Sequence, residues 1–210
     1  MLHLHPKVLL PKTKELLYTL SGDAVTDGFR LVGGTSLALQ YGHRLSVDLD
    51  FFSPTDFDAG ALAADLGRRY GMLPLTLATH TLIGVIDDIK VDFIRHPYPW
   101  LTDPIQEDAL TLATDVDIAA MKLNAIVNSG QRIKDFYDVY FLLEHHSMAR
   151  MVKAYEEKYA PANGLIAVKA VGYFGDINPK KDPVKMVKAL PFKKVQQRIE
   201  QALIHFDKIF

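Results

Sequence analysis

The sequence predicts an α+β fold, with an N-terminal α/β unit on a mixed sheet over residues 1–112 and a C-terminal helical bundle over residues 113–210. Up to about residue 94, short apolar segments with the alternation typical of strands are interspersed with helical ones. Beyond residue 113, apolar side chains recur with a helical period instead. Pro97, Pro99 and Pro104 interrupt regular structure between the two patterns, so we expect the boundary there.

The composition is that of an ordinary globular chain. Its 210 residues are enough for a sizeable core, 49% of them are hydrophobic and 23% are charged. The absence of cysteine excludes disulfides and thiolate metal sites and fits a reducing compartment. The N-terminal segment does not resemble a signal peptide, and no stretch approaches the roughly 20 apolar residues of a membrane span. We therefore expect a cytoplasmic protein with no membrane partner.

Caps and turn residues delimit the elements of the N-terminal unit. Asp58 is suited to begin a helix and Gly71 to end it, while Asp87-Asp88 is suited to the turn of a hairpin. In chain order we expect a helix over 12–20, a strand over 29–32, a short helix over 37–41, a strand around 47–51, a helix over 59–70, and strands over 73–79, 81–86 and 89–94.

The C-terminal unit is predicted to be helical throughout. Thr114 and Asp117 form a variant of the capping box before a helix over 116–128, which should bury Ile118, Met121 and Ala125. Further helices are expected over 134–145, from Ser147 to 159, over 164–174, and from Pro191 to about 206. A cleft between the two units would be the natural ligand site.

Two aspartates in the strand around residue 49 predict a metal site. Because strand side chains alternate, Asp48 and Asp50 should point one way, and Val47, Leu49 and Phe51 the other. Adjacent carboxylates repel each other, and burying them unpaired is unfavourable. A divalent cation resolves the conflict, and Mg²⁺ suits it because it binds carboxylates, keeps waters and accepts substrate phosphates. The alternative is a solvated strand face.

Gly33 and Gly34 lie between the preceding strand and a short helix. Without side chains, they let a phosphate approach backbone N–H groups. Thr35 and Ser36 are placed to cap the helix, whose N-terminus favours an anion. The alternative is a plain strand-to-helix turn. A phosphate cradle followed by metal-binding acids is typical of nucleotide transfer.

Asp92 is an isolated acid on an otherwise apolar strand. It should share a face with Lys90 and Ile94, while Val91 and Phe93 share the other. The two aspartates upstream favour Asp92 as a third metal ligand. The alternative is an edge-strand charge that discourages aggregation.

Several segments together resemble one known family. They are GGTS (33–36), HRLS (43–46), DLD (48–50), VDFIRHPYPWL (91–101), DIAAMKLNAI (117–126), KDFYDVYFLLE (134–144) and YEEKYAP (155–161). In this order and spacing, over nearly the whole chain, they resemble the AbiEii/AbiGii abortive-infection toxins of the DNA polymerase β-like nucleotidyltransferase superfamily. The resemblance implies a polymerase β-like core with a third carboxylate on a neighbouring strand.

The resemblance also implies roles for side chains of the helical unit. It places Lys122 against nucleotide phosphates, although such a lysine otherwise extends into solvent. Lys134, Asp135 and Asp138 form a KDxxD pattern. Its acids should face the cleft and organise Lys122, Arg132 or the substrate. The alternative is a helix-surface salt bridge between Lys134 and Asp138.

The basic residues nearest to the acids have less certain partners. Arg44 is expected to pair either with a phosphate or with a site carboxylate, and His43 to be part of the loop structure. Many family members carry an arginine-glycine pair where this chain has NSGQR (128–132), so the role of Arg132 stays open.

The expected activity is metal-dependent nucleotide transfer, with Mg²⁺ or Mn²⁺ as cofactor and a nucleoside triphosphate (NTP) as substrate. The resemblance implies a toxin of a toxin–antitoxin or phage-defence system, with a separately encoded antitoxin and the tRNA 3′ end as acceptor. The alternatives are a nucleotidyltransferase that adenylylates a protein and a catalytically silent nucleotide-binding module.

The charge pattern bears on the acceptor. The net charge is −1, but basic residues crowd the C-terminal part, namely Lys180, Lys181, Lys185, Lys188, Lys193, Lys194 and Arg198. On the last helix Lys194 and Arg198 should share a face, which could neutralise an RNA backbone. The alternative is a solvated lysine-rich surface.

Overall fold

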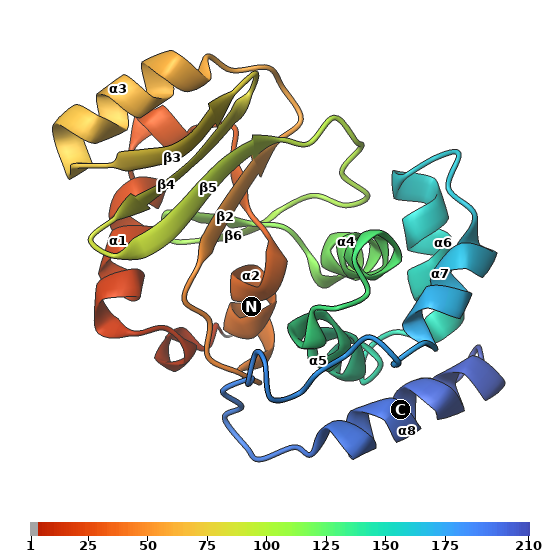
Figure 1. Ribbon diagram of the computed structural model, residues 1–210. Coiled ribbons are helices and arrows are strands. Elements are labelled where there is room, and N and C mark those ends of the chain that lie inside the picture. Colours follow the sequence, from red (N-terminus) through yellow and green to blue (C-terminus); the bar gives the residue numbers. More distant parts are fainter. Residues whose placement is uncertain (1–3) are drawn as a thin grey trace.

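The computed structural model describes residues 4–210 and has the predicted α+β architecture, in which a mixed sheet lies beside a group of helices (Figure 1). The sheet has seven strands in the order β3-β4-β5-β2-β1-β7-β6. Their bounds are β1 (Arg30–Leu31), β2 (Leu49–Ser53), β3 (Leu73–Ala78), β4 (Thr81–Ile86), β5 (Ile89–Arg95), β6 (Ile105–Glu107) and β7 (Leu110–Leu112).

The helices lie close to their predicted positions. Asp58 caps α3, Thr114 caps α4 and Ser147 caps α6, each by accepting a backbone N–H bond with its side chain. The bounds are α1 (Pro11–Ser21), α2 (Gly33–Tyr41), α3 (Ala59–Tyr70), α4 (Asp115–Asn128), α5 (Ile133–Leu142), α6 (Met148–Lys158), α7 (Gly164–Val171) and α8 (Phe192–Ile204), with short 3₁₀ helices at Pro6–Val8 and Ala24–Thr26.

The centre of the sheet sets the geometry of the site. Strand β2 pairs in parallel with β5, and the register places Asp50 directly opposite Asp92. Leu49 and Phe51 are buried, whereas Asp50 is only partly buried, so the strand alternates as predicted. Two carboxylates from different parts of the chain therefore lie side by side on one face.

Three local predictions were wrong. Helix α2 begins at Gly33 with Val32 as its N-cap, so Thr35 and Ser36 lie inside the helix and do not cap it. Strand β2 begins only at Leu49, which leaves Val47 47% exposed instead of turned into the core. Met121 and Ala125 are partly buried, whereas their neighbours on α4 such as Leu123 form the core.

The sequence prediction also missed the β6–β7 hairpin, placing only irregular chain and helix after the prolines. Each of these strands has three residues, and Asp108 in the turn has a φ of 50°. Strand β7 nevertheless pairs in parallel with β1 and extends the sheet beyond it. Such short strands have too little alternation to be recognised in the sequence.

The buried side chains form two hydrophobic clusters. One lies between the sheet, α1 and α3 and includes Leu17 and Phe93; the other lies among α4–α8 and includes Phe136. Helix α2 contributes to both, because Leu37 belongs to the helical cluster and Leu39 to the sheet cluster. The division at residue 112 stays a prediction, and α2 is where any two units would be joined.

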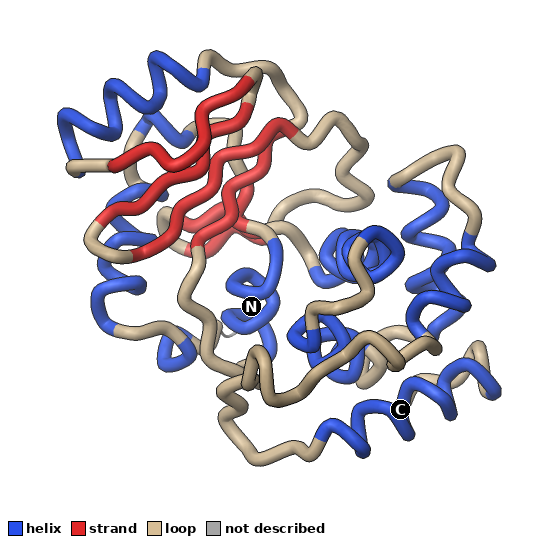
Figure 2. The backbone as a smooth tube through the Cα atoms, in the orientation of Figure 1, coloured by secondary structure: helices blue, strands red, loops and turns tan. Residues whose placement is uncertain are grey.

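A long loop connects α7 to α8 and returns to the sheet side of the molecule. Figure 2 shows this loop passing α5 before it turns back to α8. Leu45 N–H donates to the carbonyl of Lys185 at 2.8 Å, and Val187 N–H donates to that of His43 at 3.0 Å. Lys185 is thereby brought beside Asp48 and Asp50, with which it lines one cavity.

Candidate active site

The predicted acids lie together on the face of the central strands that lines a cavity with α4. Asp50 and Asp92 are opposite each other in the β2–β5 register, and Asp48 precedes β2. Burial, reinforced by the negative charges of Asp92 and Asp48, raises the pKa of Asp50 from 3.8 to about 6. The charge conflict predicted from the sequence is therefore present, and a cation near Asp50 would relieve it.

Only one of the two carboxylate oxygens of Asp92 has a partner within the protein. Lys90 makes a salt bridge to Oδ2, whereas Oδ1 is buried without a hydrogen-bond partner. An unpaired buried carboxylate oxygen is rare, and a bound cation is one way to satisfy it. Within residues 4–210, no group of three or more His, Cys, Asp or Glu side chains is already arranged to hold a metal ion. The donor chemistry suits a divalent cation, but the carboxylates are not preassembled around one.

The two glycines allow side chains to pack closely against the start of α2. Gly33 has a φ of +67°, and a Cβ atom there would lie 2.8 Å from Oδ2 of Asp50. A Cβ atom on Gly34 would lie 1.9 Å from Nη2 of Arg44. These positions therefore require glycine even without a phosphate, because a side chain would displace Asp50 or Arg44.

The hydroxyls of Thr35 and Ser36 are used inside the protein. Thr35 Oγ1 lies 2.7 Å from Ser46 Oγ and also donates to the carbonyl of Asp48. Ser36 Oγ donates to the carbonyl of Ala113 at 3.1 Å. Thr35 therefore holds the chain entering β2, while Ser36 connects α2 to the segment before α4. Neither hydroxyl needs a phosphate as a partner.

Asp138 is the centre of a buried charge network. Its carboxylate accepts bonds from Arg44 Nε at 2.7 Å and Nη2 at 3.0 Å, and lies 2.9 Å from His43 Nε2. Although burial alone would raise it, the charges of Arg44 and Lys122 hold the pKa of Asp138 well below its usual range. Asp138 is fully buried and organises basic side chains.

Lys122 extends this network from Asp138 to Asp135. Its Nζ lies 2.7 Å from Asp135 Oδ1 and 2.7 Å from Asp138 Oδ2, and the residue is only 6% exposed. Burial opposes its charge, but Asp135 and Asp138 outweigh that effect and raise its pKa, so Lys122 is a cation at neutral pH. The solvent-extended alternative for Lys122 was wrong.

The other basic residues have different partners from some of those expected. Lys134 lies 3.2 Å from Asp182 in the α7–α8 loop, so the alternative salt bridge with Asp138 was wrong. Arg44 pairs with a predicted site carboxylate, that of Asp138, which confirms one of its two alternatives. The Arg132 side chain is 64% exposed, with its Nε 3.9 Å from Asp135.

Two adjoining cavities meet at the acids. The first, which we call the basic lobe, has a volume of about 180 Å³ and includes Arg44, Lys122, Arg132, Lys134 and Lys185 in its lining. The second, the aromatic lobe, has a volume of about 380 Å³ and includes Asp92, Asp135, Phe52, His96, Tyr98 and Tyr159. Gly34, Asp48, Asp50, Lys122 and Arg132 line both.

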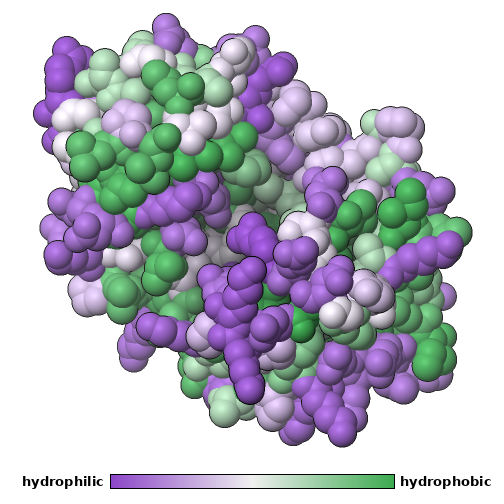
Figure 3. Space-filling model, viewed as in Figure 1, coloured by the Kyte–Doolittle hydropathy of each residue, from purple (hydrophilic) through white to green (hydrophobic). Residues whose placement is uncertain are grey.

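Figure 3 shows this face of the molecule. Hydrophobic side chains gather over the β3–β4 part of the sheet, and hydrophilic ones lie between the sheet and the helices. Leu73, Leu75 and Leu77 of the edge strand β3 are all more than half exposed, at 68%, 66% and 55%.

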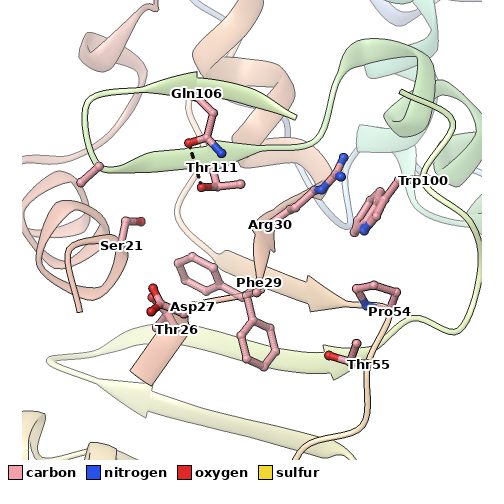
Figure 4. A pocket seen from close by; sticks show the side chains of 13 residues that line it. Ser21, Thr26, Asp27, Phe29, Arg30, Pro54, Thr55, Trp100, Gln106 and Thr111 are labelled. Atoms are coloured by element: carbon pink, nitrogen blue, oxygen red, sulfur yellow. Dashed lines mark hydrogen bonds between the residues drawn. The ribbon is translucent and has the colours of Figure 1, made fainter. Parts of the chain in front are cut away.

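A further cavity of about 440 Å³ contains none of the predicted site residues. Its lining comes from the start of β1, the end of β2 and the β6–β7 hairpin (Figure 4). There the guanidinium of Arg30 lies 4.4 Å from the ring centroid of Trp100. Arg30 also donates to the carbonyl of Thr102 at 2.9 Å, so its charge is already engaged within the protein.

The sequence prediction missed two parts of the site. His43 was assigned only to loop structure, yet its ring contacts the Asp138 carboxylate, which is 95 positions away. The aromatic residues after β5 were assigned no role in the site, only a place at the boundary between the two units and in the family resemblance. The HPYPW segment (96–100) was a usable signal, because it places aromatic rings directly after the strand that carries Asp92.

Comparisons with known proteins identify the family of the chain. The family described as the nucleotidyl transferase AbiEii toxin, of a type IV toxin–antitoxin system, matches residues 15–112 and 69–209. An uncharacterised protein of Aquifex aeolicus (strain VF5) is 34% identical over 174 residues, 80% of this chain and 84% of that protein.

Two solved structures from Helicobacter pylori share the fold. JHP933 has a TM-score of 0.59 at 16% identity, covering 95% of this chain and 93% of its own. A protein described as a candidate nucleotidyltransferase has a TM-score of 0.57 at 14% identity, covering 94% and 96%. No helix within residues 4–210 has the length and apolar character to span a membrane. The family match extends over most of the chain, which therefore belongs to the AbiEii family of nucleotidyltransferase toxins.

Proposed function

We propose that this protein transfers a nucleotide from an NTP to a hydroxyl of an RNA acceptor in a metal-dependent reaction. The supporting observation is the pairing of Asp50 with Asp92 on parallel neighbouring strands, where burial and mutual repulsion raise the pKa of Asp50 and leave Asp92 Oδ1 without a partner. This arrangement costs folding free energy unless a cation occupies it.

Asp48, Asp50 and Asp92 would hold Mg²⁺ or Mn²⁺. When bound, the ions would bind the triphosphate, activate the attacking hydroxyl and stabilise the departing pyrophosphate. Binding would require a shift of the carboxylates toward one another, and Oδ1 of Asp92 could take part while Lys90 stays on Oδ2.

The basic lobe supplies the triphosphate site. Lys122, Arg132 and Lys134 line it and would neutralise the phosphates, while backbone N–H groups at Gly33 and Gly34 lie next to it. Asp135 and Asp138 hold Lys122 in place, and Asp138 does the same for Arg44. We assign Thr35 and Ser36 to the support of this segment, because their hydroxyls already have partners.

The reaction is an in-line displacement. The acceptor oxygen forms a bond to the α-phosphorus, the bond from that phosphorus to the bridging oxygen breaks, pyrophosphate leaves, and the hydroxyl proton passes to water. The chain's own contribution is to orient the two substrates and to place positive charge where the leaving group develops negative charge.

The tRNA 3′ end is the acceptor we favour. The exposed lysines of the α7–α8 loop and of α8 would contact the phosphate backbone without reading the sequence. The family's description as part of a type IV toxin–antitoxin system supports a separately encoded antitoxin. NTP and tRNA are both abundant in the cytoplasm, where we place the reaction.

The decisive experiment supplies labelled NTPs, Mg²⁺, total RNA and total protein, and asks which polymer becomes labelled. We expect labelled RNA of tRNA size with the wild-type protein and none with Asp48→Asn or Asp50→Asn, which preserve shape but remove the charge that the metal requires. Labelled protein without labelled RNA would overturn the acceptor while leaving the site assignment intact. Full activity of either variant would overturn the mechanism.

A further inference from the structure

The aromatic lobe has a wall of three rings that the mechanism above does not use. His96, Tyr98 and Tyr159 form this aromatic wall, with ring centroids 4.9 Å apart for His96 and Tyr98 and 4.7 Å apart for Tyr98 and Tyr159. All three residues line the same cavity as Asp48, Asp50 and Asp92. The wall is therefore continuous with the proposed catalytic acids.

A buried ion pair holds the loop that carries two of the three rings. Lys158 Nζ lies 2.7 Å from Asp117 Oδ1, both side chains are fully buried, and the same ammonium donates to the carbonyl of Pro99 at 2.7 Å. Asp117 Oδ1 also accepts a bond from Leu101 N–H at 3.1 Å. Helices α4 and α6 thereby fix the loop that carries His96 and Tyr98, which favours a preformed binding surface.

The wall combines a partly exposed tyrosine with an unsatisfied polar atom. Tyr98 is 38% exposed, whereas His96 is only 7% exposed and its Nε2 is buried without a hydrogen-bond partner in the described chain. Burial and the charge of Lys158 lower the pKa of His96 to about 4, so the imidazole is neutral at neutral pH. A flat, uncharged ligand with polar edges matches this surface, and a nucleobase has those properties.

The direction of the reaction decides whether this nucleobase belongs to the NTP or to the acceptor strand. The basic lobe has three cations that the aromatic lobe lacks, Arg44, Lys134 and Lys185, whereas the aromatic lobe has only Lys90 that the basic lobe lacks. The carboxylates of Asp92 and Asp135 line the aromatic lobe alone. The triphosphate is therefore drawn to the basic side of the acids. In an in-line displacement the attacking oxygen enters opposite the leaving pyrophosphate. The acceptor terminus therefore enters from the aromatic lobe.

We infer that Tyr98 stacks against the terminal nucleobase of the acceptor strand. His96 and Tyr159, whose rings contact that of Tyr98, fix the orientation of the tyrosine ring. This inference rests on the function proposed above, because it requires an RNA acceptor. Stacking on an aromatic ring tolerates any base, so the wall would position the end of the strand without selecting its sequence.

The test compares Tyr98→Ala with Tyr98→Phe, which keeps the ring, and with Tyr173→Ala, which removes a tyrosine that is 58% exposed and lines neither lobe. The measurements are the Kd for labelled NTP with Mg²⁺ and no acceptor, and the KM for a short RNA, with thermal unfolding checked for each variant. We expect Tyr98→Ala alone to raise the KM for RNA roughly tenfold, with NTP binding unchanged.

An RNA whose last nucleotide lacks its base provides the second arm. It should raise the KM of the wild-type protein by roughly tenfold and should have no further effect on Tyr98→Ala, because the base and the ring are then both needed for one contact. Weaker NTP binding by Tyr98→Ala would overturn the inference by placing the NTP base on the wall. If neither Tyr98→Ala nor the missing base changes the KM for RNA, the inference about the aromatic wall is overturned, while the proposed function stands. If the wild-type protein labels no RNA, both the RNA acceptor of the proposed function and this inference are overturned.

Discussion

Asp50 illustrates how a functional residue can oppose stability. Its carboxylate is held beside Asp92 and Asp48, and its pKa in the folded state is about 6 instead of 3.8. Because the folded-state pKa is raised, this group favours folding fully only below the unfolded value, and the benefit is lost as the pH rises through about 6. At neutral pH and without metal, the ionised side chain therefore destabilises the protein.

We expect Asp50→Asn to stabilise the metal-free protein by about 1–3 kcal/mol at pH 8. At pH 4 it should change stability little, because that pH is close to the unfolded-state pKa of 3.8, below which Asp50 is protonated in both states. Thermal unfolding in a chelator measures this, with Asp87→Asn in the exposed β4–β5 turn as the matched control. Mg²⁺ should stabilise the wild-type protein and not Asp50→Asn. Equal unfolding temperatures for the two proteins at both pH values would mean that Asp50 is not strained.

Gly34 shows a different constraint at the same scale. A Cβ atom there would lie 1.9 Å from the Arg44 guanidinium, which Asp138 holds in the interior. We expect Gly34→Ala to separate that ion pair and to cost about 2–4 kcal/mol of unfolding free energy. Gly67→Ala is the control, because its Cβ would meet only ordinary contact at 3.6 Å, and it should be neutral or stabilising. Unchanged stability of Gly34→Ala would show that Arg44 relocates freely.

At the scale of elements, α4 and α5 present one buried and one partly exposed lysine to the basic lobe. Lys122→Ala would leave Asp135 and Asp138 without their shared cation, so we expect a loss of about 3–5 kcal/mol together with weaker NTP binding. Lys134→Ala removes only a partly exposed contact with Asp182 and should cost less than about 1 kcal/mol. Chemical denaturation and NTP titration of both variants separate the two effects.

Lys134→Ala should nevertheless weaken NTP binding, because Lys134 lines the basic lobe. An unchanged NTP affinity in this variant would remove Lys134 from the triphosphate site. A Lys122→Ala protein as stable as the wild type would show that Asp135 and Asp138 find other partners.

Local patterns in the sequence predicted the elements well where those patterns are long. The caps of α3, α4 and α6 and the hairpin with Asp87-Asp88 are all present. The α+β class and the neighbouring strands of Asp50 and Asp92 are also confirmed. The three-residue strands β6 and β7 were missed, because so short a segment has no distinguishable period.

Long-range contacts in the site were beyond sequence reasoning. The partners of Asp138 include Arg44, which is 94 positions away and lies before β2. Spacing on α5 suggested Lys134 as its partner, since residues four apart on a helix are neighbours. Tertiary packing instead turns Asp138 inward and directs Lys134 toward the α7–α8 loop. Local geometry identifies the residues that can meet, but packing decides which of them do.

At the scale of the whole molecule, the uneven charge determines where RNA can bind. Lys193 and Lys194 on α8 are exposed, whereas Arg198 donates to Glu144 at 2.6 Å and lies 3.6 Å from the ring centroid of Tyr140. The basic face predicted for the last helix is therefore divided. Its lysines are open to solvent, whereas its arginine attaches α8 to α5. Its residues should differ in their effects on RNA binding and on stability.

We expect the affinity for tRNA to fall steeply as salt rises, because phosphate contacts release counterions. Lys193→Ala and Lys194→Ala should each reduce the slope of log affinity against log salt by roughly 0.7 to 0.9, with unfolding unchanged. Arg198→Ala should instead lower the unfolding temperature, because α8 loses its contacts with Tyr140 and Glu144. Lys12→Ala on α1, across the molecule in Figure 1, is the control and should leave the slope unchanged. If the α8 lysine variants keep the wild-type slope while transfer to RNA persists, α8 lies outside the RNA path, and the exposed lysines of the α7–α8 loop become the next residues to test.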